Sequence, residues 1–128
     1  MKEAKVNTVI STSGLKAVFA ILCKWKCSTH QQIEILGISR SSYYKYRRAP
    51  YSARLNADQL ERISLILNLH ANLRTLFENP DNVYGFMRMP NHNQPFKGQS
   101  PLAYISDGYL ISLKEAAQHV EAALAGLW

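Results

Sequence analysis

A glycine between two short helical segments constrains the fold of this chain more than any other feature. The pair Ser28-Thr29 offers side-chain oxygens that cap a helix ending at about Leu36, and Gly37 follows directly. Glycine enters the left-handed conformation without steric cost, so it ends a helix in a tight turn. Ser39 is then placed to cap another helix, which we expect to run to about Arg48.

A third helix precedes this pair. From Gly14, apolar residues recur at three- and four-residue steps, at Leu15, Val18, Phe19, Leu22 and Trp25. Residues 1–13 are polar and rich in Ser and Thr, and we expect them to form a flexible leader. Three helices in about 35 residues, with a glycine turn between the last two, are typical of a helix-turn-helix domain, here over residues 14–50.

The rest of the chain is also predicted to be helical. A linker covers residues 50–56, and Asn56 or Asp58 caps a helix that reaches about Glu78 and is broken at Asn79-Pro80-Asp81. We then expect helices over residues 83–89, from Pro101 onward with Ser100 as cap, and over residues 111–125, with a loop over 90–101. No strand-like alternation occurs, so the predicted fold is all-α, with a small C-terminal helical domain over residues 55–128.

Charge divides the chain in the same way. The net charge is +6; residues 1–50 carry +7 and residues 51–128 carry −1. A strongly basic segment suits a polyanion such as DNA, whereas a nearly neutral one suits contacts with protein.

The helix after Gly37 carries the candidate DNA-binding residues. Tyr43 and Tyr46, three residues apart, are expected to pack inward, and this turns the opposite face outward. That face combines cations, which neutralise phosphates, with short hydroxyls, which let a helix sit deep in a major groove. We expect Arg40 to reach a base edge and Arg47 and Arg48 to contact phosphates. The full candidate set is Ser39, Arg40, Ser41, Ser42, Tyr44, Lys45, Arg47 and Arg48.

Other chemistries find little support. Cys23, Cys27 and His30 are too few for a structural zinc site, and no nucleophile lies beside a base in a recognisable catalytic set. We therefore predict no catalytic residue, no metal and no cofactor. No apolar run approaches the roughly 20 residues that span a bilayer, and no signal peptide is evident, so we predict a cytoplasmic protein without a membrane partner.

Two C-terminal features each allow two interpretations of a side chain's role. In the long loop over residues 90–101, Phe96 either plugs the core or contacts a partner, and Gly98 suits a left-handed bend. Trp128, which follows a break at Gly126, either folds back onto the domain or anchors an interface.

These segments together resemble a known family. The stretches Asp58–Ser64, Leu76–Pro80, Met87–Asn91, Phe96–Leu102 and Gly126–Trp128 are similar to the Xre/MbcA/ParS toxin-binding domain of bacterial antitoxins. The segment Leu36–Tyr44 resembles the helix-turn-helix that precedes that domain.

The resemblance implies an antitoxin of a type II toxin–antitoxin pair, whose partner is a RES-domain toxin that consumes NAD. Such an antitoxin occludes the toxin's active site, represses its own operon through operator DNA, and works as a homodimer or a larger toxin–antitoxin assembly. By analogy, the toxin-binding candidates are Phe96, Lys97, Gly98, Gln99, Ser100, Pro101, Leu102, Leu127 and Trp128.

Three other functions are compatible with parts of this sequence. A free-standing transcriptional regulator would use the C-terminal domain only for self-association. The stretch Leu36–Tyr44 is also similar to transposase helix-turn-helices, so a DNA-recognition subunit of a transposase is a second alternative. An enzyme is the third, and the missing catalytic set argues against it.

Overall fold

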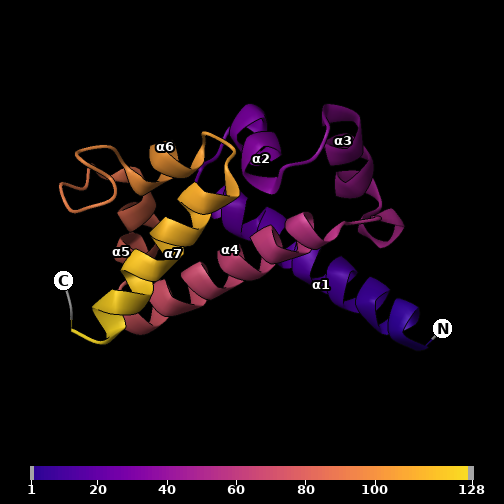
Figure 1. The fold of residues 1–128 in the computed structure, drawn as a ribbon, viewed down its shortest axis with the longest axis horizontal. Helices are drawn as coiled ribbons and strands as arrows, with labels where there is room; N and C mark the ends of the chain where they lie inside the picture. Colours follow the sequence, from indigo (N-terminus) through magenta and orange to yellow (C-terminus); the bar gives the residue numbers. More distant parts are fainter. Residues whose placement is uncertain (1, 127–128) are drawn as a thin grey trace.

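The protein is all-helical in the part that the structure describes, which confirms the predicted fold class. The computed structural model describes the backbone of residues 2–126 and the side chains of residues 12–126. Its α-helices are α1 (Lys2–Lys24), α2 (Thr29–Leu36), α3 (Arg40–Arg48), α4 (Ala57–Leu76), α5 (Pro80–Gly85), α6 (Pro101–Ile105) and α7 (Leu110–Leu124). Two short 3-10 helices, η1 (Pro50–Ser52) and η2 (Phe86–Arg88), follow α3 and α5 (Figure 1).

The N-terminal segment differs from the expectation. We predicted a flexible leader over residues 1–13, but α1 is continuous from Lys2. Residues 2–13 contain neither glycine nor proline, so nothing in the backbone chemistry ends the helix before Gly14. Polar composition was therefore a poor indicator of a missing helix.

Caps set the later helix ends. Asn56 accepts a hydrogen bond from the Gln59 amide at 2.8 Å, and the Gln59 side chain accepts one from the Asn56 amide at 3.0 Å, which forms a capping box at the start of α4. Asn79 caps α5, so Pro80 opens that helix and does not merely interrupt the chain. The helix expected over residues 83–89 thus starts three residues earlier and ends in η2.

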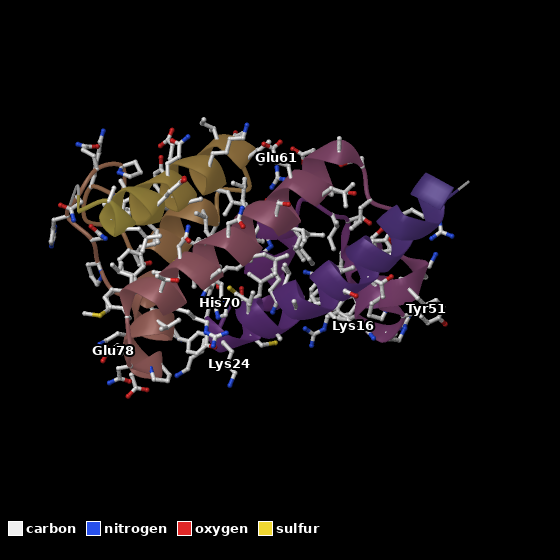
Figure 2. All side chains as sticks on the ribbon, turned by 90° about the horizontal axis from the view of Figure 1, so that it is seen from below. Lys16, Lys24, Tyr51, Glu61, His70 and Glu78 are labelled. Atoms are coloured by element: carbon white, nitrogen blue, oxygen red, sulfur yellow. The ribbon has the colours of Figure 1, made fainter. Side chains whose placement is uncertain are left out.

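Helix α4 is the centre of the arrangement. It crosses α1 and lies alongside α7 (Figure 1). Helices α2 and α3 sit above the crossing, and α5 and α6 lie on the left of the view, away from α3 (Figure 1). Glu61, His70 and Glu78 are spaced along the length of this part of the chain (Figure 2). Lys114 of α7 forms an ion pair with Glu61 of α4, with 3.1 Å between Nζ and Oε1.

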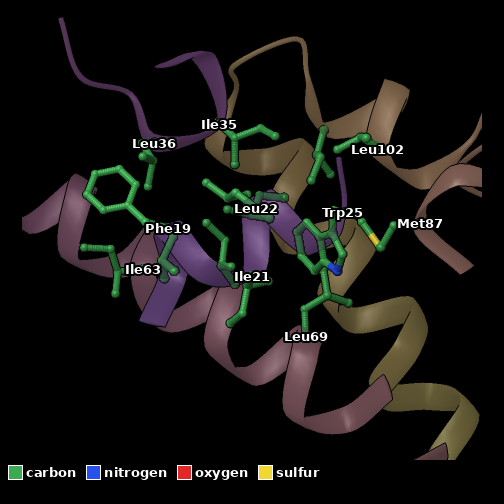
Figure 3. Close-up of a cluster of buried hydrophobic side chains, with 14 of the residues drawn as sticks. Phe19, Ile21, Leu22, Trp25, Ile35, Leu36, Ile63, Leu69, Met87 and Leu102 are labelled. Carbon is green, nitrogen blue, oxygen red and sulfur yellow. The ribbon is translucent and has the colours of Figure 1, made fainter. Parts of the chain in front are cut away.

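One hydrophobic core joins both predicted domains. Trp25 is fully buried beside Leu22 of α1, and Leu69 of α4 and Met87 of η2 belong to the same cluster (Figure 3). The core continues through Ile35 of α2 into α6 and α7. The helix-turn-helix is therefore packed on the C-terminal helices, and the change of charge near residue 50 falls inside one packed body.

Candidate nucleic-acid interface

The turn between α2 and α3 has the geometry that the sequence predicted. Gly37 takes the left-handed conformation, with φ of 65°, and its amide donates to the Ile33 and Glu34 carbonyl oxygens. Ser39 caps α3, because its Oγ accepts a hydrogen bond from the Ser42 amide at 3.1 Å. These local bonds fix where α3 begins.

The inner face of α3 is anchored by two tyrosines. Tyr43 is 4% exposed and Tyr46 is 8% exposed, so both pack inward as predicted. The Tyr43 hydroxyl donates to Gln32 Oε1 at 2.9 Å, and its ring meets the Phe19 ring edge-on at a centroid distance of 5.8 Å. Because a buried hydroxyl needs a partner, this bond to α2 also fixes the rotation of α3 about its axis.

Most of the candidate residues share the outer face of α3. The exposed ones are Ser39, Arg40, Ser41, Tyr44, Lys45, Arg47 and Arg48, and Ser42 is half-buried. Residues 35–57 contain no Asp or Glu, so no carboxylate of the turn or of α3 neutralises these cations. A protruding helix with exposed guanidinium, ammonium and hydroxyl groups matches the phosphates and base edges of duplex DNA.

Arg47 is the exception within this set. Its guanidinium lies over the Phe19 ring at 5.2 Å and the Tyr43 ring at 5.8 Å, and Nη1 donates to Cys23 Sγ at 3.7 Å. The bond to Cys23 raises the pKa of Arg47 above its usual value, and an arginine is a permanent cation even without this shift. Arg47 therefore faces α1, at the flank of the outer face.

Two residues of α4 hold the turn from below, and the sequence reasoning missed both. Arg62 is only 8% exposed, and its Nη1 donates to the Glu34 and Ile35 carbonyl oxygens at 3.3 and 3.2 Å. Gln59 Nε2 donates to the Gly37 carbonyl oxygen at 3.1 Å. The Ile35 carbonyl lies in the last turn of α2, where no helical amide is available to it, and Arg62 gives the Glu34 oxygen a second donor beside the Gly37 amide. Side chains of α4 therefore help to cap α2.

A signal for Arg62 was present in the sequence. Asp58 precedes it by four residues, and the structure joins Arg62 Nε to Asp58 Oδ2 at 2.8 Å. An acidic residue four positions before an arginine predicts an ion pair along one side of a helix, although it does not predict that the arginine is buried. What the sequence could not supply is the other partner, because α2 lies far from α4 along the chain.

The residues predicted to contact the toxin separate into two groups. Phe96 is 1% exposed, and Pro101 and Leu102 are also buried, so these three build the loop from inside. Lys97 and Gln99 are exposed, and Gly98 takes a φ of 96° as the predicted left-handed bend. Ser100 caps α6 by accepting from the Ala103 amide at 3.1 Å. Leu127 and Trp128 lie outside the described residues.

Aromatic contacts hold this loop. The Phe96 ring meets Tyr104 edge-on at 5.5 Å and His119 edge-on at 5.1 Å, which places α6 and α7 on either side of it. Of the two predicted roles of Phe96, the burial of its ring favours packing in the core.

The cysteines are free thiols in different surroundings. Cys23 is exposed, whereas burial, with a smaller effect from Cys23, raises the pKa of the half-buried Cys27 to about 12. Among the side chains of residues 12–126, no three His, Cys, Asp or Glu residues gather as a metal site requires. Each helix within residues 2–126 is too short or too polar to cross a lipid bilayer.

Comparison with known proteins agrees with this geometry. Residues 7–68 match the profile of the antitoxin Xre-like helix-turn-helix domain. The matched stretch runs from α1 into α4, so it includes both the turn and its anchors, Gln59 and Arg62. A protein of Sinorhizobium fredii (strain NBRC 101917 / NGR234), named uncharacterized protein y4oB, is 33% identical over 113 residues, which cover 88% of this chain and 84% of y4oB.

Proposed function

Since the chain belongs to the same family as y4oB and carries an antitoxin Xre-like helix-turn-helix domain, we propose that it is the antitoxin of a type II toxin–antitoxin pair. In this proposal, α3 binds operator DNA and represses the chain's own operon. The C-terminal helices bind a RES-domain toxin and occlude its NAD-consuming active site. The antitoxin itself catalyses nothing.

The observation that supports the DNA-binding part of the proposal is the outer face of α3. Arg40 stands at the exposed N-terminal end of the helix, from which a guanidinium reaches the acceptor pair of a guanine. Lys45 and Arg48 lie farther along and neutralise phosphates. Two copies of the chain would place two recognition helices on half-sites about 34 Å apart. An operator-binding protein works in the cytoplasm, where the chromosome lies.

The toxin-binding part of the proposal rests on the loop before α6 and on the chain's end. Lys97 and Gln99 are the exposed side chains among the toxin-binding candidates of the loop, and they are the proposed direct contacts. Phe96, Pro101 and Leu102 support them from the core, and Gly98 and Ser100 set the backbone. Leu127 and Trp128 add the proposed apolar anchor, because tryptophan is common at the centre of interfaces.

The DNA-binding part of the proposal is tested by titrating the purified chain against a labelled duplex that covers the region upstream of its own gene. The double variant R40A/K45A should lose binding at physiological salt. K24A is the matched control, since Lys24 is an exposed cation of α1 away from α3. Equal binding by wild type and R40A/K45A would contradict the DNA-binding part of the proposal.

The toxin-binding part of the proposal is tested by searching the neighbouring genes for one that encodes a RES-domain protein and co-expressing that protein with this chain. Wild type and R40A/K45A should both restore growth, whereas K97A/Q99A and a chain lacking residues 126–128 should restore it poorly. DNA binding without any toxin partner would favour the free-standing regulator. Co-purification with a transposase catalytic subunit would favour the other alternative.

A further inference from the structure

A groove runs beside the recognition helix, between α1 and the segment α3–η1. It has a volume of about 660 Å³, and Phe19 and Pro50 form part of its apolar lining. Three of its lining residues are cations, namely Lys16, Arg47 and Arg48, and none is acidic. Lys16 and Tyr51 lie near the same end of the molecule, and both face outward (Figure 2).

The cations of this groove are arranged for a ligand larger than a single ion. Arg47 is fixed in place by its contacts with Phe19, Tyr43 and Cys23. Binding a ligand therefore costs little further conformational entropy of this side chain. Lys16 is exposed and has no ion pair among those that the described side chains form. Tyr51 is 72% exposed, which leaves its hydroxyl open to an external acceptor.

The groove is continuous with the outer face of α3. Arg48 belongs to both, because it is an exposed cation of the last turn of α3 and also lines the groove. In a duplex, the phosphates of one strand border the major groove that a recognition helix enters. A strand that leaves the outer face past Arg48 therefore meets Lys16, Arg47 and Tyr51 next.

We propose that this groove seats the sugar–phosphate backbone of the operator duplex, with Lys16 of α1 as a phosphate contact separate from α3. This inference rests on the proposed DNA-binding function and extends its footprint to a helix outside the turn. Lys16 positions the duplex without reading its sequence, because phosphate contacts carry no base information.

The first test compares K16Q with K24Q. Both variants remove one lysine charge from an exposed position of α1, but Lys24 lies over the Tyr84 ring at 5.9 Å, on the side of α5. For K16Q, the slope of log affinity against log salt concentration should become shallower by about 0.9, the value for one lost phosphate contact. The weakening should be equal on operator and unrelated duplexes. Identical slopes for K16Q, K24Q and wild type would overturn the inference.

The second test uses Cys23 as a reporter, since it is exposed and lines the groove. Bound operator duplex should slow alkylation of Cys23 by iodoacetamide at least several-fold. Cys27, whose pKa is raised to about 12 by burial, serves as a slow internal control in the same chain. Unchanged Cys23 alkylation at saturating duplex would overturn the inference, and so would protection by inorganic phosphate alone.

The two proposals fail differently. If R40A/K45A binds the operator like wild type, the proposed function is wrong. If R40A/K45A loses binding while K16Q keeps the wild-type salt slope and Cys23 is unprotected, only the proposal about the groove is wrong.

Discussion

The turn at Gly37 and the loop over residues 90–100 are both irregular connections, but they are held in different ways. Polar side chains of α4 hold the turn, through the bonds that Arg62 and Gln59 donate to backbone carbonyl oxygens. Backbone hydrogen bonds within the loop close it, such as that from the Gly98 amide to the Asn91 carbonyl oxygen at 2.8 Å. The aromatic ring of Phe96, buried against Tyr104 and His119, attaches the loop to α6 and α7.

This difference means that the two connections contribute differently to the orientation of α3 and to the free energy of folding. Hydrogen bonds are directional, so the bonds to the turn fix the angle at which α3 leaves α2. Apolar burial is non-directional and scales with area, so the Phe96 ring contributes mostly to the free energy of folding. We therefore expect changes in the loop to alter stability most, and changes at the turn to alter DNA binding beyond their cost in stability.

The largest effect on stability is expected for F96A. Removing a fully buried aromatic ring leaves a cavity between α6 and α7 and should lower the free energy of unfolding by about 3–5 kcal/mol. The affinity of the remaining folded protein for DNA should be unchanged. Urea unfolding followed by circular dichroism measures the first quantity. The neighbouring exposed substitution Q99A should change stability by less than about 0.5 kcal/mol, and a similar loss there would contradict the account.

The next effect is expected for R62M, which keeps the apolar bulk of the side chain but removes its donors. The buried Ile35 carbonyl oxygen loses its donor, while the Glu34 oxygen keeps the Gly37 amide, and this loss should cost about 1–3 kcal/mol. The operator affinity should fall further than the loss of folded protein explains, since α3 is no longer held at one angle.

The matched control for R62M is D58N. Asp58 shares the ion pair with Arg62, but its side chain is 46% exposed. Losing this partly exposed pair alone should cost less than about 1 kcal/mol. R62M protein that binds DNA as tightly as wild type, per folded molecule, would show that Arg62 does not position α3.

A loss of comparable size is expected for G37A, because the added Cβ would also displace the Arg62 guanidinium. The φ of 65° puts any side chain in the left-handed region, which costs about 1–2 kcal/mol, and an added Cβ would lie 2.9 Å from Arg62 Cζ. G85A is the control, because Gly85 has an ordinary helical φ of −66° and open space at the Cβ position. G85A should be neutral or stabilise by about 0.4–1 kcal/mol. A G37A protein as stable as wild type would contradict the need for glycine at the turn.

The smallest effect is a dependence of stability on pH. Burial lowers the pKa of His70, assisted by Arg74, and burial also lowers the pKa of His119. An unfolded histidine titrates near pH 6.5, so below that value the unfolded chain binds more protons than the folded one. Stability should therefore fall as pH decreases from 7.5 to 5.5.

The double variant H70Q/H119Q should show a weaker dependence over that interval, measured by urea unfolding at each pH. H30Q, on an exposed side chain, controls for the loss of an imidazole. A wild-type protein that gains stability on acidification through this range would contradict the assignment.

Local chemistry made most of the fold predictable. The caps at Ser39 and Ser100 lie where the sequence predicted them, because each bond joins residues three apart. The structure selects Ser28 over Thr29, and Asn56 over Asp58, from the pairs that the sequence offered. The inward packing of Tyr43 and Tyr46 followed from their spacing. The helix over residues 2–13 was missed, because the polar, Ser- and Thr-rich composition of this segment predicted a flexible leader.

The candidate site was predictable only where it depends on one helix. The exposure of Arg40 and Lys45 followed from the periodicity of α3. Arg47 leans inward because of its contacts with Cys23 and Phe19 of α1. Arg62 bonds to Glu34 and Ile35, which precede it by 28 and 27 positions in the chain. Such contacts between distant segments leave no periodic signal in a single sequence.

The most direct test of the central claim is to map where DNA binds, by recording amide chemical shifts in nuclear magnetic resonance spectra during titration with the operator duplex. The account predicts shifts concentrated on residues 39–48 and on the groove-lining residues of α1 and η1, with the amides of residues 96–100 and 102 unmoved. Shifts concentrated on the loop, with α3 unmoved, would contradict the claim that the exposed face of α3 is the DNA-binding surface.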